Sequence, residues 1–487
     1  MRGATVIAVD IGAESGRVHA VSLERGRLRQ RHVHRFTTGA VEVGGTLYWN
    51  VLAIWDEVRR GIRRARPLAA TSVGVDTWGV DFALLDERGR LLGNPVHYRD
   101  RRTEGMMEAL FERIPRERVF DATGIQIMPI NTVYQLLSMV LADDPQLDAA
   151  VTFLTMPDLL HYWLSGARAC EFTIATTTQL LDPRTQGWSR PILEAVGVEP
   201  ALFPPVVQPG TRLGSFEGLE VIAPAGHDTA CAVVGAPALD DDFAYISSGT
   251  WSLVGIETDA PVMGPTALAE NVTNEGGVAA TTRLLKNVTG LWIVQQCQRA
   301  WQEDGVSLGY GDLVREAERA PPLRSLIDPD HPDFLRAGPH PAMIRAHCRA
   351  TGQPAPGSPG ATVRSVLDSL ALAYRRALEA VERVSGRSVG RIHVVGGGAR
   401  NGLLCQATAD ATGRPVTAGP AEATILGNGA VQLMSVGALT DLAEARRAIA
   451  RGCRVRRYAP TRGRGAWDAA YERWNALAWP STWRDHG

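Results

Sequence analysis

One short pattern occurs twice in this chain of 487 residues. An apolar strand runs into a turn of small, hydroxyl-bearing and glycine residues, and a second apolar strand follows. The first turn is Asp10–Arg17 and the second is Ser247–Thr250. Apolar segments on either side of a glycine-containing turn are typical of two paired strands. The repeat predicts that the second half of the chain copies the α/β architecture of the first.

The length of the chain also requires more than one hydrophobic core, because single cores stop growing at about 250–300 residues. Pro237 and the acidic run Asp240–Asp242 separate the two patterned halves. We therefore expect an N-terminal domain over residues 1–238 and a C-terminal domain over residues 239–487.

The overall charge excludes several classes of partner. The formal net charge is −1 and the pI is about 6.8, so no global attraction toward nucleic acid or an anionic membrane is expected. The six cysteines form no Cys-x-x-Cys pair, which is typical of reduced thiols. No segment approaches a signal peptide or the roughly 20 residues of a membrane span. These features predict a cytoplasmic protein whose partners are small molecules.

Two glycine-containing turns have the composition of phosphate or nucleotide sites. Asp10–Arg17 combines backbone amides, a hydroxyl and an arginine, although a plain hairpin is the alternative. It lacks the Gly-x-x-x-x-Gly-Lys pattern of a P-loop. Farther on, Gly396–Gly398 follows a strand and precedes a predicted helix, where a nucleotide could lie against bare backbone. Asn401 replaces the third glycine of the dinucleotide fingerprint, which argues against an NAD site.

The middle of the chain places an acidic residue at the start of a helix. Gly226 bends the chain after an apolar strand, and Asp228 opens a run of small and apolar residues. An aspartate there is usually a helix cap. Trp78 and Gly79 stand at another break between strands, beside two further acids, and Trp78 is either a core residue or a platform for a sugar.

Other signals define helices and loops. Asn50 is expected to cap an amphipathic helix, and Asn131 to cap a helix over 132–141. The Pro- and Gly-rich segment 351–360 predicts a surface loop. A long amphipathic helix follows it and ends near Gly386.

Taken in order, these motifs resemble the FGGY carbohydrate kinases, and the resemblance extends to about residue 435. The motifs that carry it are Asp10–Arg17, Asp76–Phe82, Gly226–Ala230, Ser247–Ser252 and Val394–Gly398. Further segments resemble the members of the family that act on the ketose L-rhamnulose. These are Tyr98–Asp100, Thr123–Gln126, Asn131–Leu136, Ala175–Leu180, Thr273–Gly277 and Leu285–Asn287.

The resemblance implies an actin-like ATPase fold, with two ribonuclease-H-like domains and an interdomain cleft that closes over the substrate. It implies Asp228 as the general base, and ATP bound mainly by the second domain. The residues implied to contact ATP are Ala13, Glu14, Ser15, Gly16, Arg17, Thr250, Gln295 and Gly397. Those implied to line the sugar site are Gly79, His227, Asp228, Thr229 and Asn287.

The chemistry of phosphoryl transfer agrees with these roles. A carboxylate within hydrogen-bond reach can take the proton of the attacking hydroxyl, and a helix N-terminus favours its ionised form. Mg²⁺ is expected to bridge the ATP phosphates largely through water, with Asp10 as its nearby carboxylate. We expect the protein to work as a monomer or homodimer.

Four residues leave the details open. Glu14 puts a negative charge in a phosphate-facing turn, and Ile127 and Ile130 stand where related sequences have phenylalanine. Lys286, the only lysine, has either a site role or an ordinary structural one. The expected reaction is phosphorylation of L-rhamnulose at O1. The alternatives are another ketose (L-fuculose, xylulose or ribulose) or a non-catalytic actin-like sensor of sugar or nucleotide.

Overall fold

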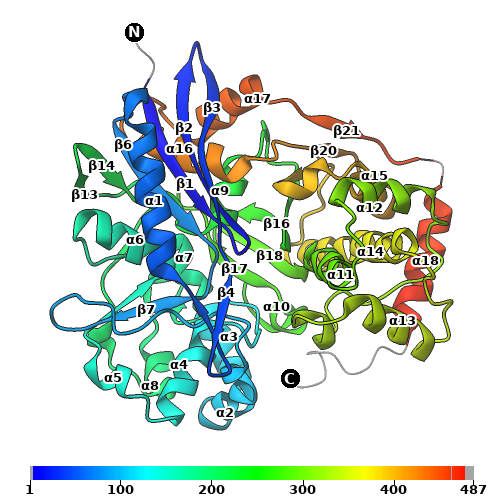
Figure 1. Ribbon diagram of the computed structural model, residues 1–487, viewed down its shortest axis with the longest axis horizontal. Coiled ribbons are helices and arrows are strands. Elements are labelled where there is room, and N and C mark those ends of the chain that lie inside the picture. Colours follow the sequence, from blue (N-terminus) through cyan, green and yellow to red (C-terminus); the bar gives the residue numbers. More distant parts are fainter. Residues whose placement is uncertain (1–3, 462, 478–487) are drawn as a thin grey trace. The chain divides into compact units, whose positions relative to one another are not determined.

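The computed structural model describes residues 4–461 and 463–477, which fold into two compact units. The first unit runs to Leu239 and also takes in Glu257–Leu284 and Glu422–Cys453. The second consists of Asp240–Ile256, Leu285–Ala421 and the chain from Arg454 onward. Each unit contains a mixed β-sheet with helices packed against it (Figure 1).

The main sheet of the first unit has the strand order β13-β14-β6-β1-β2-β3. Its strands are β1 (Thr5–Ile11), β2 (Ser15–Glu24), β3 (Arg27–Thr37), β6 (Ser72–Thr77), β13 (Arg212–Phe216) and β14 (Leu219–Ile222). β1 is antiparallel to β2 and parallel to β6, and β14 is parallel to β6. Six of the seven residues of β1 are buried, as expected for an apolar strand covered on both faces.

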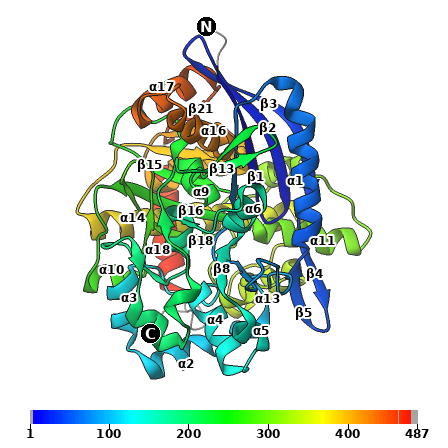
Figure 2. The same cartoon turned by 90° about the vertical axis from the view of Figure 1, so that its left-hand side faces the viewer.

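Helices α1 (Val51–Ala65) and α16 (Ala423–Ser435) cover opposite faces of this sheet (Figure 2). The predicted cap of α1 is confirmed, because Asn50 Oδ1 accepts a hydrogen bond from the Ala53 amide at 3.2 Å. A hydrophobic core lies between the sheet, α16, α9 (Asp228–Val234) and α17 (Leu442–Gly452). α16 and α9 meet closely at Gly427, where a Cβ atom would stand 1.8 Å from the Cys231 carbonyl oxygen.

The rest of the first unit is made of short elements. Its helices are α2 (Met106–Arg113), α3 (Arg116–Thr123), α4 (Thr132–Leu141), α5 (Pro145–Ala149), α6 (Met156–Ser165), α7 (Phe172–Thr177), α8 (Arg190–Val196) and α10 (Pro265–Ala269). Its strands are β4 (Ala40–Val43), β5 (Thr46–Trp49), β7 (Phe82–Leu85), β8 (Thr152–Thr155), β9 (Cys170–Glu171), β10 (Leu181–Asp182), β11 (Gly187–Trp188), β12 (Val206–Val207) and β17 (Thr273–Gly276). The α4 helix is as predicted, but the Asn131 side chain bonds the Gln126 carbonyl and Gln179 instead of capping the helix.

The sheet of the second unit contains the order β18-β16-β15-β19-β20-β21. Its strands are β15 (Ala244–Ser248), β16 (Trp251–Thr258), β18 (Thr282–Thr289), β19 (Ile392–Val395), β20 (Val416–Ala418) and β21 (Arg456–Tyr458). β15 is antiparallel to β16 and parallel to β19, which repeats the pairing of β1 with β2 and β6. The predicted repetition of the architecture is therefore confirmed.

The helices of the second unit are α11 (Trp292–Glu303), α12 (Tyr310–Arg319), α13 (His340–Ala350), α14 (Pro359–Ser385), α15 (Gly402–Thr412) and α18 (Arg464–Ala476). The long helix α14 begins inside the predicted loop 351–360, because Ser358 Oγ caps it by accepting from the Ala361 amide. Gly386 ends it with a left-handed φ of 69°. No helix in the described part of the chain is long and apolar enough to span a membrane.

Candidate functional site

Asp228 stands at the start of α9, which begins one residue earlier than predicted. β14 ends at Ile222, and the extended backbone of His227 occupies the cap position, so Asp228 is the first helical residue and not the cap. The Thr77 amide donates to the Gly226 carbonyl at 2.9 Å, which ties this turn to the end of β6. Thr229 Oγ1 donates to Asp228 Oδ1 at 3.1 Å. The Asp228 side chain keeps 29 % exposure, so a substrate hydroxyl can reach it.

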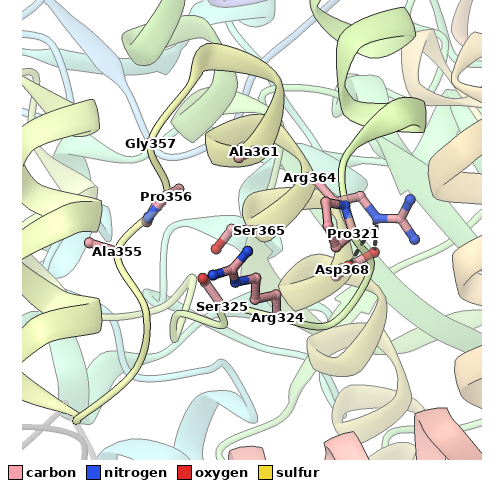
Figure 3. A pocket seen from close by; sticks show the side chains of 10 residues that line it. All are labelled: Pro321, Arg324, Ser325, Ala355, Pro356, Gly357, Ala361, Arg364, Ser365 and Asp368. Atoms are coloured by element: carbon pink, nitrogen blue, oxygen red, sulfur yellow. Dashed lines mark hydrogen bonds and ion pairs between the residues drawn. The ribbon is translucent and has the colours of Figure 1, made fainter.

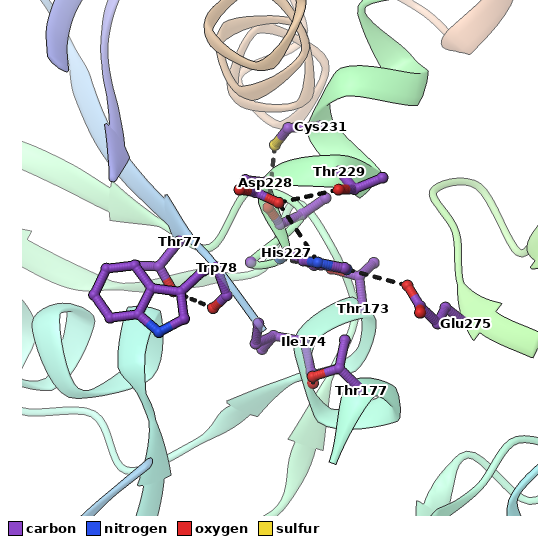
Figure 4. A network of polar contacts seen from close by, with 12 residues as sticks. Thr77, Trp78, Thr173, Ile174, Thr177, His227, Asp228, Thr229, Cys231 and Glu275 are labelled. Carbon is purple, nitrogen blue, oxygen red and sulfur yellow. Dashed lines mark hydrogen bonds and ion pairs between the residues drawn. The ribbon is translucent and has the colours of Figure 1, made fainter. Parts of the chain in front are cut away.

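His227 lies between Asp228 and Glu275 (Figure 4). Its Nε2 is 3.5 Å from Asp228 Oδ1, and its Nδ1 is 3.2 Å from Glu275 Oε2. Glu275 also pairs with Arg283 at 3.0 Å, and the Arg283 side chain is completely buried. Burial alone would raise the pKa of Glu275, but Arg283 and His227 outweigh it and hold that pKa below its usual range. The side chain next to Asp228 is thus held by an ionised carboxylate.

The backbone of the same turn is fixed by Glu171, which precedes α7. Glu171 Oε2 accepts from the Gly226 amide at 2.7 Å and from Thr173 Oγ1 at 2.6 Å. The Thr173 hydroxyl in turn lies 3.2 Å from the His227 amide. Burial raises the pKa of Glu171 although these donors oppose the shift. His227 is therefore held through both its main chain and its ring.

A second acidic group lies where β1 and β6 end. Asp10 and Asp76 are paired in the parallel register of these strands, so their carboxyls are neighbours. Arg17 Nη2 contacts Asp10 Oδ2 at 2.8 Å, and Asn428 Nδ2 donates to Asp76 at 2.6 Å. Burial raises the pKa of Asp10 to about 6, with Arg17 opposing the rise and Asp228 adding to it. Asp10, Asp76 and Asp228 all lie in the first unit.

Arg17 links Asp10 to Glu422, the residue that directly precedes α16. Its guanidinium contacts both Asp10 and Glu422, and the two carboxylates raise its pKa against the opposing effect of burial. The hairpin turn itself contains Ala13 and Glu14 between β1 and β2. Gly16 lies on β2 directly under the Phe36 ring, where a Cβ atom would come within 2.1 Å of the ring. Gly16 thus has a packing role in addition to any role in binding phosphate.

Four of the predicted ligand contacts belong to the second unit. Gln295 Nε2 lies 3.5 Å from Thr250 Oγ1, so these two side chains are neighbours. Gly397 begins a short 3₁₀ turn after β19, beside β15. Asn287 lies on β18. The positive charge of its neighbour Lys286 acts on the buried Asp330, whose pKa is nonetheless raised by burial.

Trp78 and Asp81, on either side of Gly79, are packed inside the fold. Trp78 is 6 % exposed, packs against the Trp49 ring and donates its indole N–H to Asp81 at 2.9 Å, so it is a core residue. A Cβ atom on Gly79 would stand 3.1 Å from Thr177 Oγ1, so a larger residue would crowd this turn. Ile127 is buried, and its backbone is held by the side chain of Asn271 at 2.9 Å. The Asn271 side chain therefore has a structural role.

Several residues of the site were not predicted from the sequence. They are Asp76, Glu171, Glu275, Arg283, Glu422 and Asn428. Asp76 had a usable signal, because it stands next to the last residue of an apolar strand, as Asp10 does. Arg283 and Asn428 had none, since each lies inside an otherwise ordinary strand or helix.

Comparison with known proteins places both halves of the chain in one family. Residues 5–246 match the model of the N-terminal domain, and residues 244–436 that of the C-terminal domain, of the FGGY family of carbohydrate kinases. A rhamnulokinase from Bacteroides thetaiotaomicron is 44 % identical over 95 % of this chain and 97 % of its own length. A rhamnulokinase from Pectobacterium atrosepticum is 40 % identical over 98 % and 97 %, respectively.

Solved structures share the fold at lower identity. Gluconate kinase from Lactobacillus acidophilus superposes with a TM-score of 0.78 over 96 % of both chains at 15 % identity. Glycerol kinase from Plasmodium falciparum, solved with ADP, gives a TM-score of 0.74 over 97 % of both chains at 14 % identity. The predicted actin-like α/β fold with two sheet-containing domains is confirmed.

Proposed function

Because this chain belongs to the FGGY family of carbohydrate kinases, we propose that it transfers the γ-phosphoryl group of ATP to the O1 hydroxyl of L-rhamnulose. The support for this particular sugar is the near full-length similarity to proteins named rhamnulokinases. In the reaction, O1 forms a bond to the γ-phosphorus while the bond to the bridging oxygen breaks, which releases ADP. The attacking hydroxyl loses its proton during this exchange.

Asp228 is the group that takes this proton. The observation that carries the assignment is its position: a part-exposed carboxylate on the first turn of α9, next to His227. Partial exposure leaves room for a substrate hydroxyl, while the Thr229 hydroxyl fixes one carboxylate oxygen. His227 and Thr229, with Gly79 and Asn287, are proposed to bind the sugar.

The nucleotide is assigned to the turn Ala13–Arg17, with Glu14, Ser15 and Gly16, and to Thr250, Gln295 and Gly397 of the second unit. Arg17 supplies positive charge next to Asp10. We propose that residues 239–487 hold most of the ATP, whereas residues 1–238, together with Asn287, hold the sugar. This division follows the two predicted domains.

The residues at the ends of β1 and β6 fit Mg²⁺. Asp76 Oδ1 is buried without a hydrogen-bond partner among the described residues, and Asp10 lies beside it with a raised pKa. A hard cation prefers carboxylate oxygens and water, and it would keep both carboxyls ionised. No described cluster of three or more His, Cys, Asp or Glu side chains could hold a metal alone, so the ATP phosphates would complete the coordination. Bound Mg²⁺ would neutralise phosphate charge.

The proposal is tested with a panel of ketoses, ATP and Mg²⁺. We expect the highest kcat/KM on L-rhamnulose, and a preference for xylulose, ribulose or L-fuculose would reassign the sugar. Asp228→Asn should lower kcat by about 100-fold or more while ATP affinity stays near the wild-type value. Normal turnover by this variant would show that another base acts. No turnover of any ketose by the wild-type protein would favour the sensor interpretation.

A further inference from the structure

A pocket of about 280 Å³ lies entirely within the second unit and shares no residue with the candidate site (Figure 3). It is formed by the segment 321–325, the segment 355–357 and the first turns of α14. Part of its lining is apolar, contributed by Pro321, Pro356 and Ala361. The pocket is large enough for a small organic molecule.

A buried hydroxyl without a partner lines this pocket. Ser365 is 3 % exposed, and its Oγ makes no hydrogen bond to any described residue. In Figure 3 the Ser365 side chain is directed toward the middle of the pocket, near the head of Arg324. A buried hydroxyl that lacks a partner is unfavourable, so this group is suited to a ligand that offers a hydrogen-bond acceptor.

The charged residues of the lining give the pocket a net positive charge. Arg324 and Arg364 contribute two positive charges and Asp368 one negative charge, which leaves +1. Arg364 Nε bonds both Asp368 oxygens at 2.9 and 3.0 Å, and Asp368 also accepts from the Leu323 amide. Arg364 and Asp368 therefore neutralise each other. Arg324 is exposed and makes no hydrogen bond or ion pair with any residue that the structure describes.

The pocket also borders the first turns of α14, which contribute Ala361, Arg364 and Ser365 to its lining. α14 has 27 residues and is capped by Ser358, and its dipole places partial positive charge at this end. A helix N-terminus together with an arginine and a hydroxyl is a combination that binds phosphate oxygens. Three independent features therefore favour an anion in the same place.

We propose that this pocket binds a small phosphate monoester. Arg324 and Ser365 contact the phosphate oxygens, and the apolar wall of prolines and Ala361 contacts the carbon skeleton. This site is separate from the kinase reaction and does not depend on the identity of the sugar substrate.

The proposal is tested by titration calorimetry with glycerol 3-phosphate, and with glycerol as the uncharged control. A saturating non-hydrolysable ATP analogue occupies the nucleotide site throughout. We expect wild-type protein to bind glycerol 3-phosphate and not glycerol. Arg324→Gln and Ser365→Ala should each weaken binding about tenfold or more, because each removes a contact to the phosphate.

Two variants serve as controls. Arg457→Gln changes an exposed arginine on β21, outside the pocket, and should bind as the wild type does. Arg17→Gln alters the proposed nucleotide site and should also keep the affinity. The proposal is overturned if wild-type protein does not bind glycerol 3-phosphate, if Arg324→Gln binds as tightly as wild type, or if Arg17→Gln abolishes the signal. Ketose turnover is measured separately, so the two proposals can fail independently.

Discussion

Replacing Glu275 with glutamine tests whether a buried ion pair holds His227. The substitution keeps the shape of the side chain but removes its charge, so the Arg283 guanidinium loses the carboxylate that faces it. At 3.0 Å the pair attracts by about 5.5 kcal/mol at an effective dielectric constant of 20, before desolvation is counted. The Arg283 side chain is 0 % exposed, so water cannot replace the lost partner.

Loss of one partner from a buried pair costs about 3–5 kcal/mol. The glutamine oxygen can still accept a bond from Arg283, so we expect a loss near 3 kcal/mol in the free energy of unfolding. The measurement is urea unfolding followed by tryptophan fluorescence and by circular dichroism, because a free energy is defined only where the two transitions coincide. We also expect kcat/KM for the ketose to fall about tenfold, because His227 Nδ1 loses the charged carboxylate of Glu275 while its contact with Arg283 Nη2 at 3.2 Å remains.

The matched control is an exposed ion pair of the same unit. Arg212 and Glu220 lie 3.1 Å apart with side-chain exposures of 55 % and 42 %, so Glu220→Gln should cost less than about 1 kcal/mol. The double variant Glu275→Leu with Arg283→Met should regain most of the stability but not the activity. A loss below about 1 kcal/mol in Glu275→Gln, with unchanged kcat/KM, would refute the idea that this pair positions His227.

Three further outcomes follow from the packing and the acidic group. Gly427→Ala should lower the free energy of unfolding in urea by about 3 kcal/mol or more, because its Cβ would clash with the Cys231 carbonyl. The control is Gly465→Ala, which has open space around it and should stabilise α18 slightly. For Asp10, burial raises the pKa from 3.8 to about 6, so the folded protein holds a proton that the unfolded chain releases between these pH values. The resulting contribution to the free energy of unfolding is complete below pH 4 and is lost as the pH rises through 6. The unfolding free energy of wild type relative to Asp10→Asn should fall by about 3 kcal/mol between pH 4 and 8, and a flat difference would contradict the raised pKa. Mg²⁺ with ADP should reduce the fall in unfolding free energy between about pH 4 and 8. Asp76→Asn should weaken this effect of Mg²⁺.

The sequence predicted the repeated strand-turn-strand units because the pattern is local. Apolar alternation around Asp10–Arg17 and around Ser247–Thr250 reports strand pairing directly, and both hairpins form as expected. The sequence also predicts the long helix α14, but it places the start of this helix after residue 360 instead of at Pro359. Ser358 and Pro359 resemble a loop in composition, yet a serine cap followed by proline is also a good helix start.

The supporting contacts could not be predicted from local patterns, since they join distant parts of the chain. Asn428 reaches Asp76 across 352 positions, and Arg17 reaches Glu422 across 405. Such pairs depend on how α16 packs on the sheet, which single-sequence patterns do not specify. The resemblance to a family implied a role for Asp228 but did not indicate the residues that hold His227.

Asp228 shows why position within a helix matters for the proposed chemistry. A capping aspartate turns its carboxylate onto the amides of the first turn, where it would accept bonds and become a poorer base. Here the extended His227 takes the cap position, so Asp228 belongs to the helix. Its carboxylate lies near the positive end of α9 but points toward Thr229 and His227. The one-residue difference from the predicted cap therefore supports its proposed role, because it leaves the carboxylate available for a substrate proton.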